Sequence, residues 1–161
     1  MSTLTLHLPD AAATEACGAR IAPCLHGGMI VTLQGELGTG KTTLVRGLLR
    51  ARGVEGPIKS PTYTLVEHYP VSSLYFYHFD FYRFARASEW DDAGMSDYFR
   101  DDAVCVVEWP ERAGDRLPPA DLALSLSYAA EARGRNLVAI ANSPECDRCL
   151  NALRATGASP A

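Results

Sequence analysis

The stretch Gly-Glu-Leu-Gly-Thr-Gly-Lys-Thr-Thr, residues 35 to 43, decides the fold of this 161-residue chain. It follows the apolar run 29–33, which predicts a buried strand. It precedes apolar residues spaced three and four apart over 41–52, which predict an amphipathic helix. The stretch fits the pattern G-x-x-x-x-G-K-[ST], which holds phosphate groups when it joins a strand to a helix. A chance match is expected in about one of a few hundred chains of this length, so we expect a phosphate-binding loop.

Each residue type in this loop has a physical role toward a nucleotide. Gly35, Gly38 and Gly40 let backbone N–H groups converge on phosphate oxygens at the positive end of the following helix. Lys41 supplies a positive charge for the β- and γ-phosphates, and Thr42 offers a hydroxyl to Mg²⁺. We therefore expect a nucleoside triphosphate with Mg²⁺ at the loop. The residues expected to contact the nucleotide are Glu36, Leu37, Gly38, Thr39, Gly40, Lys41, Thr42 and Thr43.

Two acidic side chains follow apolar runs later in the chain. Asp80 comes after the run 74–79, and Glu108 comes after the run 104–107. Ligands of open α/β sheets bind at the carboxyl ends of the strands, and Mg²⁺ takes one or two carboxylates beside phosphate oxygens. Glu108 is the better match to the usual apolar strand followed by an acid. Either residue could hold the metal's water or orient the attacking water, and either could merely cap a loop.

The rest of the chain predicts an α/β fold: a three-layer sandwich of the phosphate-loop type, with a mostly parallel central sheet and an added antiparallel hairpin. The hairpin is expected from 121–128 and 136–141. After Ser143 the periodicity fades, so we expect one domain over 1–142 and a tail over 143–161. The other expected strands are 3–8, 62–69, 74–79 and 103–107, and the other expected helices begin at Asp10 and span 88–99.

Charge and composition exclude several classes of protein. The chain has 15 basic and 19 acidic residues, a net charge of −4, whereas nucleic-acid binders usually carry a basic stripe. No apolar run approaches the roughly 20 residues of a membrane span, and the amino terminus lacks the pattern of a signal peptide. Five cysteines cannot all pair within one chain, and Cys146 and Cys149 lack two nearby partners for a zinc site. We expect a cytoplasmic protein without membrane or direct nucleic-acid partners.

Four segments, taken in order, resemble the bacterial TsaE (YjeE) family. They are the loop at 35–43, Ser-Pro-Thr-Tyr-Thr-Leu-Val at 60–66, His-Phe-Asp-Phe-Tyr-Arg at 78–83 and Val-Glu-Trp-Pro-Glu-Arg at 107–112. Many families share the loop, but the three later motifs in this order are far more specific. The resemblance covers roughly residues 1–142. The family is the ATPase component of the machinery that makes threonylcarbamoyladenosine beside the anticodon of tRNA.

The resemblance implies ATP and Mg²⁺ as cofactors, Lys41, Asp80 and Glu108 as catalytic residues, and Thr42, Asp80 and Glu108 at the metal. It implies the proteins TsaB and TsaD as partners, which would hold the tRNA, and hydrolysis that is weak without them and resets their complex. It also implies a segment that senses the nucleotide or couples it to the partners. Its residues are Ser60, Thr62, Tyr63, Thr64, Tyr82, Arg83 and Trp109.

Without the resemblance, other interpretations stay open. Residues 60–64 equally predict a turn before an edge strand, and Trp109 is more typical of a core. The same loop serves small-molecule and nucleotide kinases, although these usually carry an arginine-rich lid. A binding module gated by the nucleotide is a further alternative. A GTPase is disfavoured because no Asn-Lys-x-Asp stretch is present, and Arg83 is the nearest candidate for an arginine finger.

Overall fold

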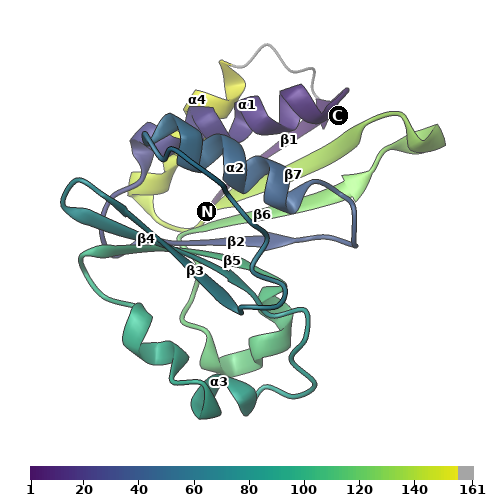
Figure 1. The fold of residues 1–161 in the computed structure, drawn as a ribbon. Coiled ribbons are helices and arrows are strands. Elements are labelled where there is room, and N and C mark those ends of the chain that lie inside the picture. The colour runs from purple at the N-terminus through teal and green to yellow at the C-terminus, as the bar shows by residue number, and fades with distance from the viewer. Residues whose placement is uncertain (156–161) are drawn as a thin grey trace.

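A seven-stranded mixed sheet forms the centre of the computed structural model, which describes residues 1–155 (Figure 1). Four neighbouring strands, β6, β2, β5 and β4, run parallel, and the edges are antiparallel. The strand order is β1-β7-β6-β2-β5-β4-β3. The strands are β1 (Ser2–Leu8), β2 (Ile30–Gln34), β3 (Val66–Val71), β4 (Leu74–Asp80), β5 (Ala103–Glu108), β6 (Leu122–Tyr128) and β7 (Arg135–Ala141). The predicted α/β class, mostly parallel centre and added hairpin β6–β7 are confirmed.

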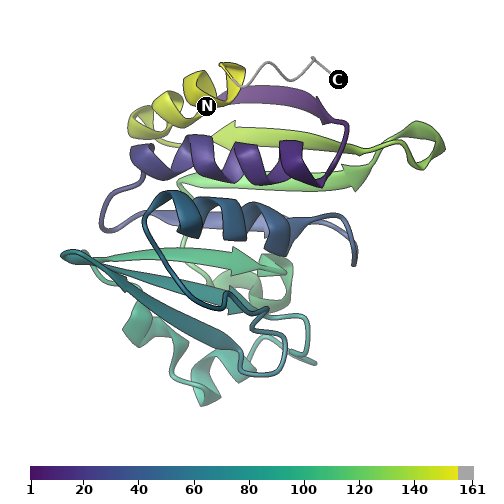
Figure 2. The same cartoon turned by 45° about the horizontal axis from the view of Figure 1, so that its top comes forward.

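Helices cover both faces of the sheet, which makes three layers (Figures 1 and 2). The long helices lie on one face, and the short elements α3, η2 and η3 lie on the other. The helices are α1 (Ala11–Ile21), α2 (Lys41–Ala51), α3 (Glu89–Asp92) and α4 (Asp147–Arg154). Short 3₁₀ turns complete the chain: η1 (Ala22–Cys24), η2 (Met95–Tyr98), η3 (Pro110–Arg116), η4 (Ala130–Ala132) and η5 (Pro144–Cys146). Among the residues described, no helix is long and apolar enough to cross a membrane.

Alternation along the strands divides the core into two clusters. On β4, Phe76 joins the cluster under α1, α2 and α4, whereas Tyr77 and Phe79 join the aromatic cluster on the opposite face. Helices α1 and α2 approach closely because a glycine stands at the crossing. A Cβ atom at Gly47 would lie 2.0 Å from the carbonyl oxygen of Glu15. A larger residue at position 47 would force the two helices apart.

Two predicted elements are wrong in extent. The helix expected over 88–99 is broken into α3 and η2, because Gly94 between them adopts a left-handed conformation with φ of 65°. The strand expected over 62–69 begins only at Val66, because Leu65 is also left-handed, with φ of 72°. Thr62 to Thr64 therefore lie in a turn, as the alternative for residues 60–64 had it.

The region after Ser143 is not a structureless tail over the part that the structure describes. Helix α4 carries Cys149, Leu150 and Leu153 on one face, and all three are buried in the cluster beneath α1. The turn η5 buries Cys146 in the same cluster. Elements η5 and α4 therefore pack into the main core, while the last part of the tail predicted over 143–161, residues 156–161, lies outside the described residues.

Candidate functional site

The loop between β2 and α2 has the backbone that its glycines predict. Gly38 and Gly40 have φ of 79° and 102°, which residues with a Cβ rarely adopt. Gly40 is the N-cap of α2, and no side chain of the described residues caps this end of the helix. The first N–H groups of an 11-residue helix thus point from its positive end toward the loop. This arrangement suits an anion such as a phosphate group.

Lys41 lies buried inside the loop, with 5% of its surface exposed. Its ammonium group donates to the carbonyl oxygens of Gly35 at 2.5 Å and Glu36 at 2.9 Å. It also lies 4.5 Å from the centre of the Trp109 ring. Burial lowers the pKa of Lys41, and the nearby charges of Glu108, Asp80 and Glu111 oppose this shift. The loop therefore holds a desolvated positive charge among acceptors and acids.

The two acids expected near the metal lie side by side. The parallel pairing of β4 with β5 sets Asp80 directly opposite Glu108, and both are almost fully buried. The hydroxyl of Thr42, at the start of α2, donates to Glu108 Oε2 at 3.0 Å. The same oxygen lies 2.6 Å from Nε2 of His78, a buried residue of β4. A hydroxyl and two carboxylates are ligands that Mg²⁺ prefers, so these side chains fit that ion.

Asp80 is held by the segment that follows α2. One carboxylate oxygen accepts from the Tyr82 N–H at 2.9 Å, and the other accepts from the Thr62 hydroxyl at 3.1 Å. Thr62 in turn lies 2.7 Å from the hydroxyl of Ser60. Burial raises the pKa of Asp80, and the charge of Glu108 raises it further, against the two hydrogen bonds. Asp80 is thus a carboxylate whose ionisation is costly and whose position depends on Thr62.

The aromatic residues predicted for the coupling segment lie around this centre. Tyr63 is 83% exposed, and the guanidinium carbon of Arg83 stands 4.2 Å from its ring centre. Trp109 is half-buried, contacts the Tyr82 ring at 5.0 Å between centres and has a left-handed backbone with φ of 57°. A tryptophan in this conformation carries strain, which is found most often at functional positions. The Thr64 hydroxyl donates a hydrogen bond to the carboxylate of Glu67, not to a residue of the site.

A cavity of about 230 Å³ brings the predicted residues together. Its lining includes the loop, both acids, two residues of the following segment and the tryptophan after β5. The residues that line it are Leu37, Gly38, Gly40, Lys41, Thr42, Thr43, Ser60, Thr62, Asp80, Glu108 and Trp109. Tyr63, Thr64, Tyr82 and Arg83 do not line it, so the cavity collects only part of the predicted coupling segment.

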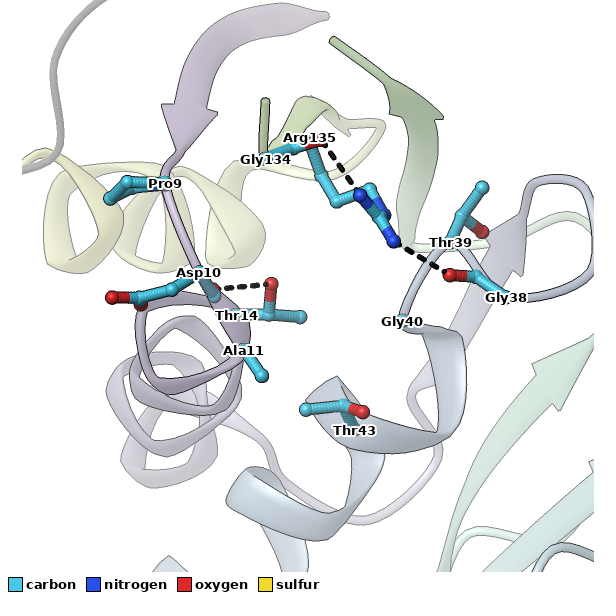
Figure 3. Close-up of a pocket in the computed structure, with 10 residues that line it drawn as sticks. All are labelled: Pro9, Asp10, Ala11, Thr14, Gly38, Thr39, Gly40, Thr43, Gly134 and Arg135. Atoms are coloured by element: carbon cyan, nitrogen blue, oxygen red, sulfur yellow. Dashed lines mark hydrogen bonds between the residues drawn. The ribbon is translucent and has the colours of Figure 1, made fainter. Parts of the chain in front are cut away.

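A second cavity of about 260 Å³ opens on the other side of the loop (Figure 3). It shares Gly38, Gly40 and Thr43 with the first cavity, and its far wall comes from Asp10, at the start of α1, and Arg135, on β7. Arg135 donates to the carbonyl oxygen of Gly38 at 3.1 Å. Sequence reasoning missed both wall residues as site residues. Asp10 reads as a helix cap, which it is, and no local pattern marks Arg135.

The hairpin β6–β7 also holds the loop in place. The Tyr128 hydroxyl donates to the carbonyl oxygen of Leu37 at 2.5 Å, and the Arg135 guanidinium carbon lies 4.5 Å from the Tyr128 ring centre. These contacts occupy carbonyl groups of the loop. The Thr39 N–H is also occupied, by the carbonyl oxygen of Glu36 at 3.3 Å, whereas the first N–H groups of α2 remain to face a ligand.

Comparison with known proteins gives a consistent result. A family model described as "Threonylcarbamoyl adenosine biosynthesis protein TsaE" matches residues 8–137. The tRNA threonylcarbamoyladenosine biosynthesis protein TsaE of Haemophilus influenzae is 41% identical over 147 residues, which cover 88% of this chain and 93% of that protein. The Bacillus subtilis protein of the same name is 35% identical over 118 residues, 73% of each chain. The crystal structure of Bacillus subtilis YdiB superposes with a TM-score of 0.79 at 25% identity, covering 95% of both chains.

Proposed function

The chain belongs to the TsaE family, and on that premise we propose that it is an ATPase that hydrolyses ATP with Mg²⁺. Its place is in the modification of tRNA with threonylcarbamoyladenosine, the process named for the family. The observation that carries the ATPase proposal is the Thr42–Glu108 hydrogen bond beside Asp80, at the end of a phosphate loop that buries Lys41. It puts a hydroxyl, two carboxylates and a lysine around one cavity.

We assign different roles to the two acids. Glu108 would serve the metal, because it already contacts Thr42, whose hydroxyl is the expected Mg²⁺ ligand. Asp80 would orient the attacking water, because its carboxylate faces the same cavity and is held by Thr62 instead of the loop. When bound, Mg²⁺ would neutralise charge that develops on the phosphate oxygens. Lys41 and the N–H groups at the start of α2 would stabilise the rest of that charge.

The nucleoside would occupy the cavity of Figure 3. Thr43, whose hydroxyl we expect to reach the α-phosphate, lines both cavities, whereas Asp80 and Glu108 line only the opposite one. A triphosphate along the loop would therefore run from Arg135 toward Asp80 and Glu108. No arginine-rich lid is evident among residues 1–155: Arg83 stacks on Tyr63 and does not line the acid cavity. This supports water as the acceptor of the phosphoryl group.

The proposed partners are TsaB and TsaD, whose complex the hydrolysis would reset, with the tRNA held by them. The net charge of −4 supports this indirect role toward tRNA. A cytoplasmic location follows from the same proposal, since the tRNA is modified there.

The test is to mix the pure protein with TsaB and TsaD of its own organism and to measure phosphate release and tRNA modification. We expect the partners to stimulate hydrolysis, and Glu108→Gln to abolish it. The matched control Glu145→Gln changes an exposed glutamate and should retain it. No stimulation, together with no requirement for modification, would refute the proposal. If tRNA modification survives Glu108→Gln while hydrolysis is lost, the protein is a binding module gated by the nucleotide. If mass spectrometry finds a phosphorylated metabolite, the protein is a kinase.

A further inference from the structure

His78 is a buried histidine whose two ring nitrogens have different surroundings. It lies on β4, two residues before Asp80, with 1% of its surface exposed. Its Nε2 lies 2.6 Å from Glu108 Oε2, and its Nδ1 is buried without a hydrogen-bond partner in the part of the chain that the structure describes. Such an unpaired atom is uncommon in a folded protein and calls for an explanation.

The geometry fixes which nitrogen carries the proton. A proton on Nδ1 alone would bury an N–H without an acceptor, and it would set the lone pair of Nε2 against a carboxylate oxygen at 2.6 Å. A proton on Nε2 gives a short hydrogen bond to the carboxylate and leaves only an unpaired lone pair at Nδ1. His78 therefore donates from Nε2 to Glu108.

The Thr42 hydroxyl and the His78 ring both donate to the same carboxylate oxygen of Glu108. Oε2 accepts from His78 at 2.6 Å and from Thr42 at 3.0 Å, whereas among residues 1–155 Oε1 has only the longer Thr42 contact of 3.3 Å. A carboxylate oxygen has two lone pairs, so Oε2 is saturated and Oε1 keeps capacity for a further ligand. The pair of donors thus distinguishes an anchored oxygen from an available one.

We propose that His78 is a positioning residue that holds Glu108 Oε2 so that Oε1 serves the nucleotide-bound metal. This inference rests on the proposed function, in which the Thr42 hydroxyl is itself required at the metal. Once that hydroxyl turns to the ion, His78 remains as the donor that keeps the carboxylate in place. His78 is buried on β4, inside the sheet between β5 and β3, and not on the segment that carries Thr62.

Two substitutions of similar polarity separate positioning from simple packing. In His78→Gln the amide nitrogen is as many bonds from the backbone as Nε2, so a donor to Glu108 is kept. In His78→Asn the amide nitrogen takes the place of Nδ1, which has no partner, so that donor is lost. The affinity of a fluorescent N-methylanthraniloyl ATP analogue is measured in EDTA and during titration with Mg²⁺. Thermal unfolding of each variant is measured in EDTA.

We expect all three proteins to bind the analogue comparably in EDTA. The Mg²⁺ concentration for half-maximal tightening should rise by about 10- to 100-fold in His78→Asn, the scale found when an outer partner of a metal ligand is removed. His78→Gln should stay close to the unsubstituted protein. Equal Mg²⁺ dependence in the two variants, whether retained or lost, overturns the positioning role.

Nitrogen-15 NMR of the unsubstituted protein gives an independent test that needs no variant to fold. It should show the Nε2–H form of His78, and a proton on Nδ1 alone would overturn the inference. A protein whose analogue binding never responds to Mg²⁺ would instead refute the proposed function. The two failures are therefore distinguishable.

Discussion

Replacing Asp80 with asparagine is expected to stabilise the protein in EDTA while abolishing its ATP hydrolysis. Asp80 and Glu108 face each other across β4 and β5, and both are almost fully buried. Burial and the repulsion between two like charges in this position oppose folding, and the nearby Lys41 offsets part of that cost. The substitution removes one of the charges and keeps the shape of the side chain.

The magnitude follows from the sheet geometry. Neighbouring strands are about 4.8 Å apart, and two unit charges about 5 Å apart repel by about 3 kcal/mol at an effective dielectric constant of about 20. Asparagine can keep both hydrogen bonds, accepting from the Tyr82 N–H and donating to the Thr62 hydroxyl, but each bond loses about 1 kcal/mol of charge assistance. The net gain is about 1 kcal/mol, or about 2–4 °C in the unfolding midpoint for a chain of this size.

The pH dependence has a definite sign. Burial and the Glu108 charge raise the pKa of Asp80 in the folded protein above its ordinary value of 3.8. The cost of ionising Asp80 is therefore absent below the ordinary value and complete above the folded value. The gain in stability from Asp80→Asn should be complete at pH 8. It should fade as the pH falls through the pKa of Asp80 in the folded protein toward 4.

Urea and thermal unfolding in EDTA between pH 4.5 and 8 measure this difference. Asp92→Asn removes the same charge from an exposed position on α3 and should change the stability little. An Asp80→Asn protein that is less stable than the unsubstituted one at pH 8 would refute the reasoning. So would a gain that is equal at both ends of the pH range.

Two further predictions concern helix α4 and the buried thiols. Leu150→Ala should lower the free energy of unfolding by about 2–5 kcal/mol in urea, because Leu150 is buried beneath α1, whereas Asn151→Ala on the exposed face should change it little. Burial raises the pKa of Cys17 to about 11 and of Cys149 to about 12, so in the folded protein both should resist a thiol reagent while the half-buried Cys24 reacts. Mass spectrometry locates the label, and a Cys149 that reacts as fast as Cys24 would contradict the prediction.

The elements that sequence predicted well are those with strong local patterns. The loop at 35–43 is bounded by a five-residue buried strand and a helix, and both boundaries lie within one or two residues of those expected. The strand before Glu108 is a continuous apolar run, and the strand before Asp80 is apolar and aromatic except for His78, as expected of parallel strands inside a sheet. For these segments, local composition and tertiary environment demand the same structure.

The failures have specific physical causes. The turn η5 and helix α4 together have buried residues at 146, 149, 150 and 153, a helical spacing, but two of them are cysteines and a thiol is a weak apolar signal. The break at Gly94 depends on a left-handed glycine that a helical pattern does not reveal. Arg135 reaches the loop only because the antiparallel hairpin returns to it, some 97 residues along the chain from Gly38.

The sequence does not show which groups donate hydrogen bonds to Asp80 and Glu108. The strand before Glu108 is wholly apolar and the strand before Asp80 contains His78, but this difference says nothing about the hydrogen-bond partners of either acid. The structure distinguishes them by their donors: Glu108 is held by His78 in the sheet and by Thr42 of the loop, and Asp80 by Thr62 of the turn at 62–64 and the Tyr82 N–H. Displacing that turn would remove a donor from Asp80 and leave both donors of Glu108 unchanged. Under the proposed function, a partner that contacts this turn would therefore act on the orientation of water, while the metal ligand stays in place.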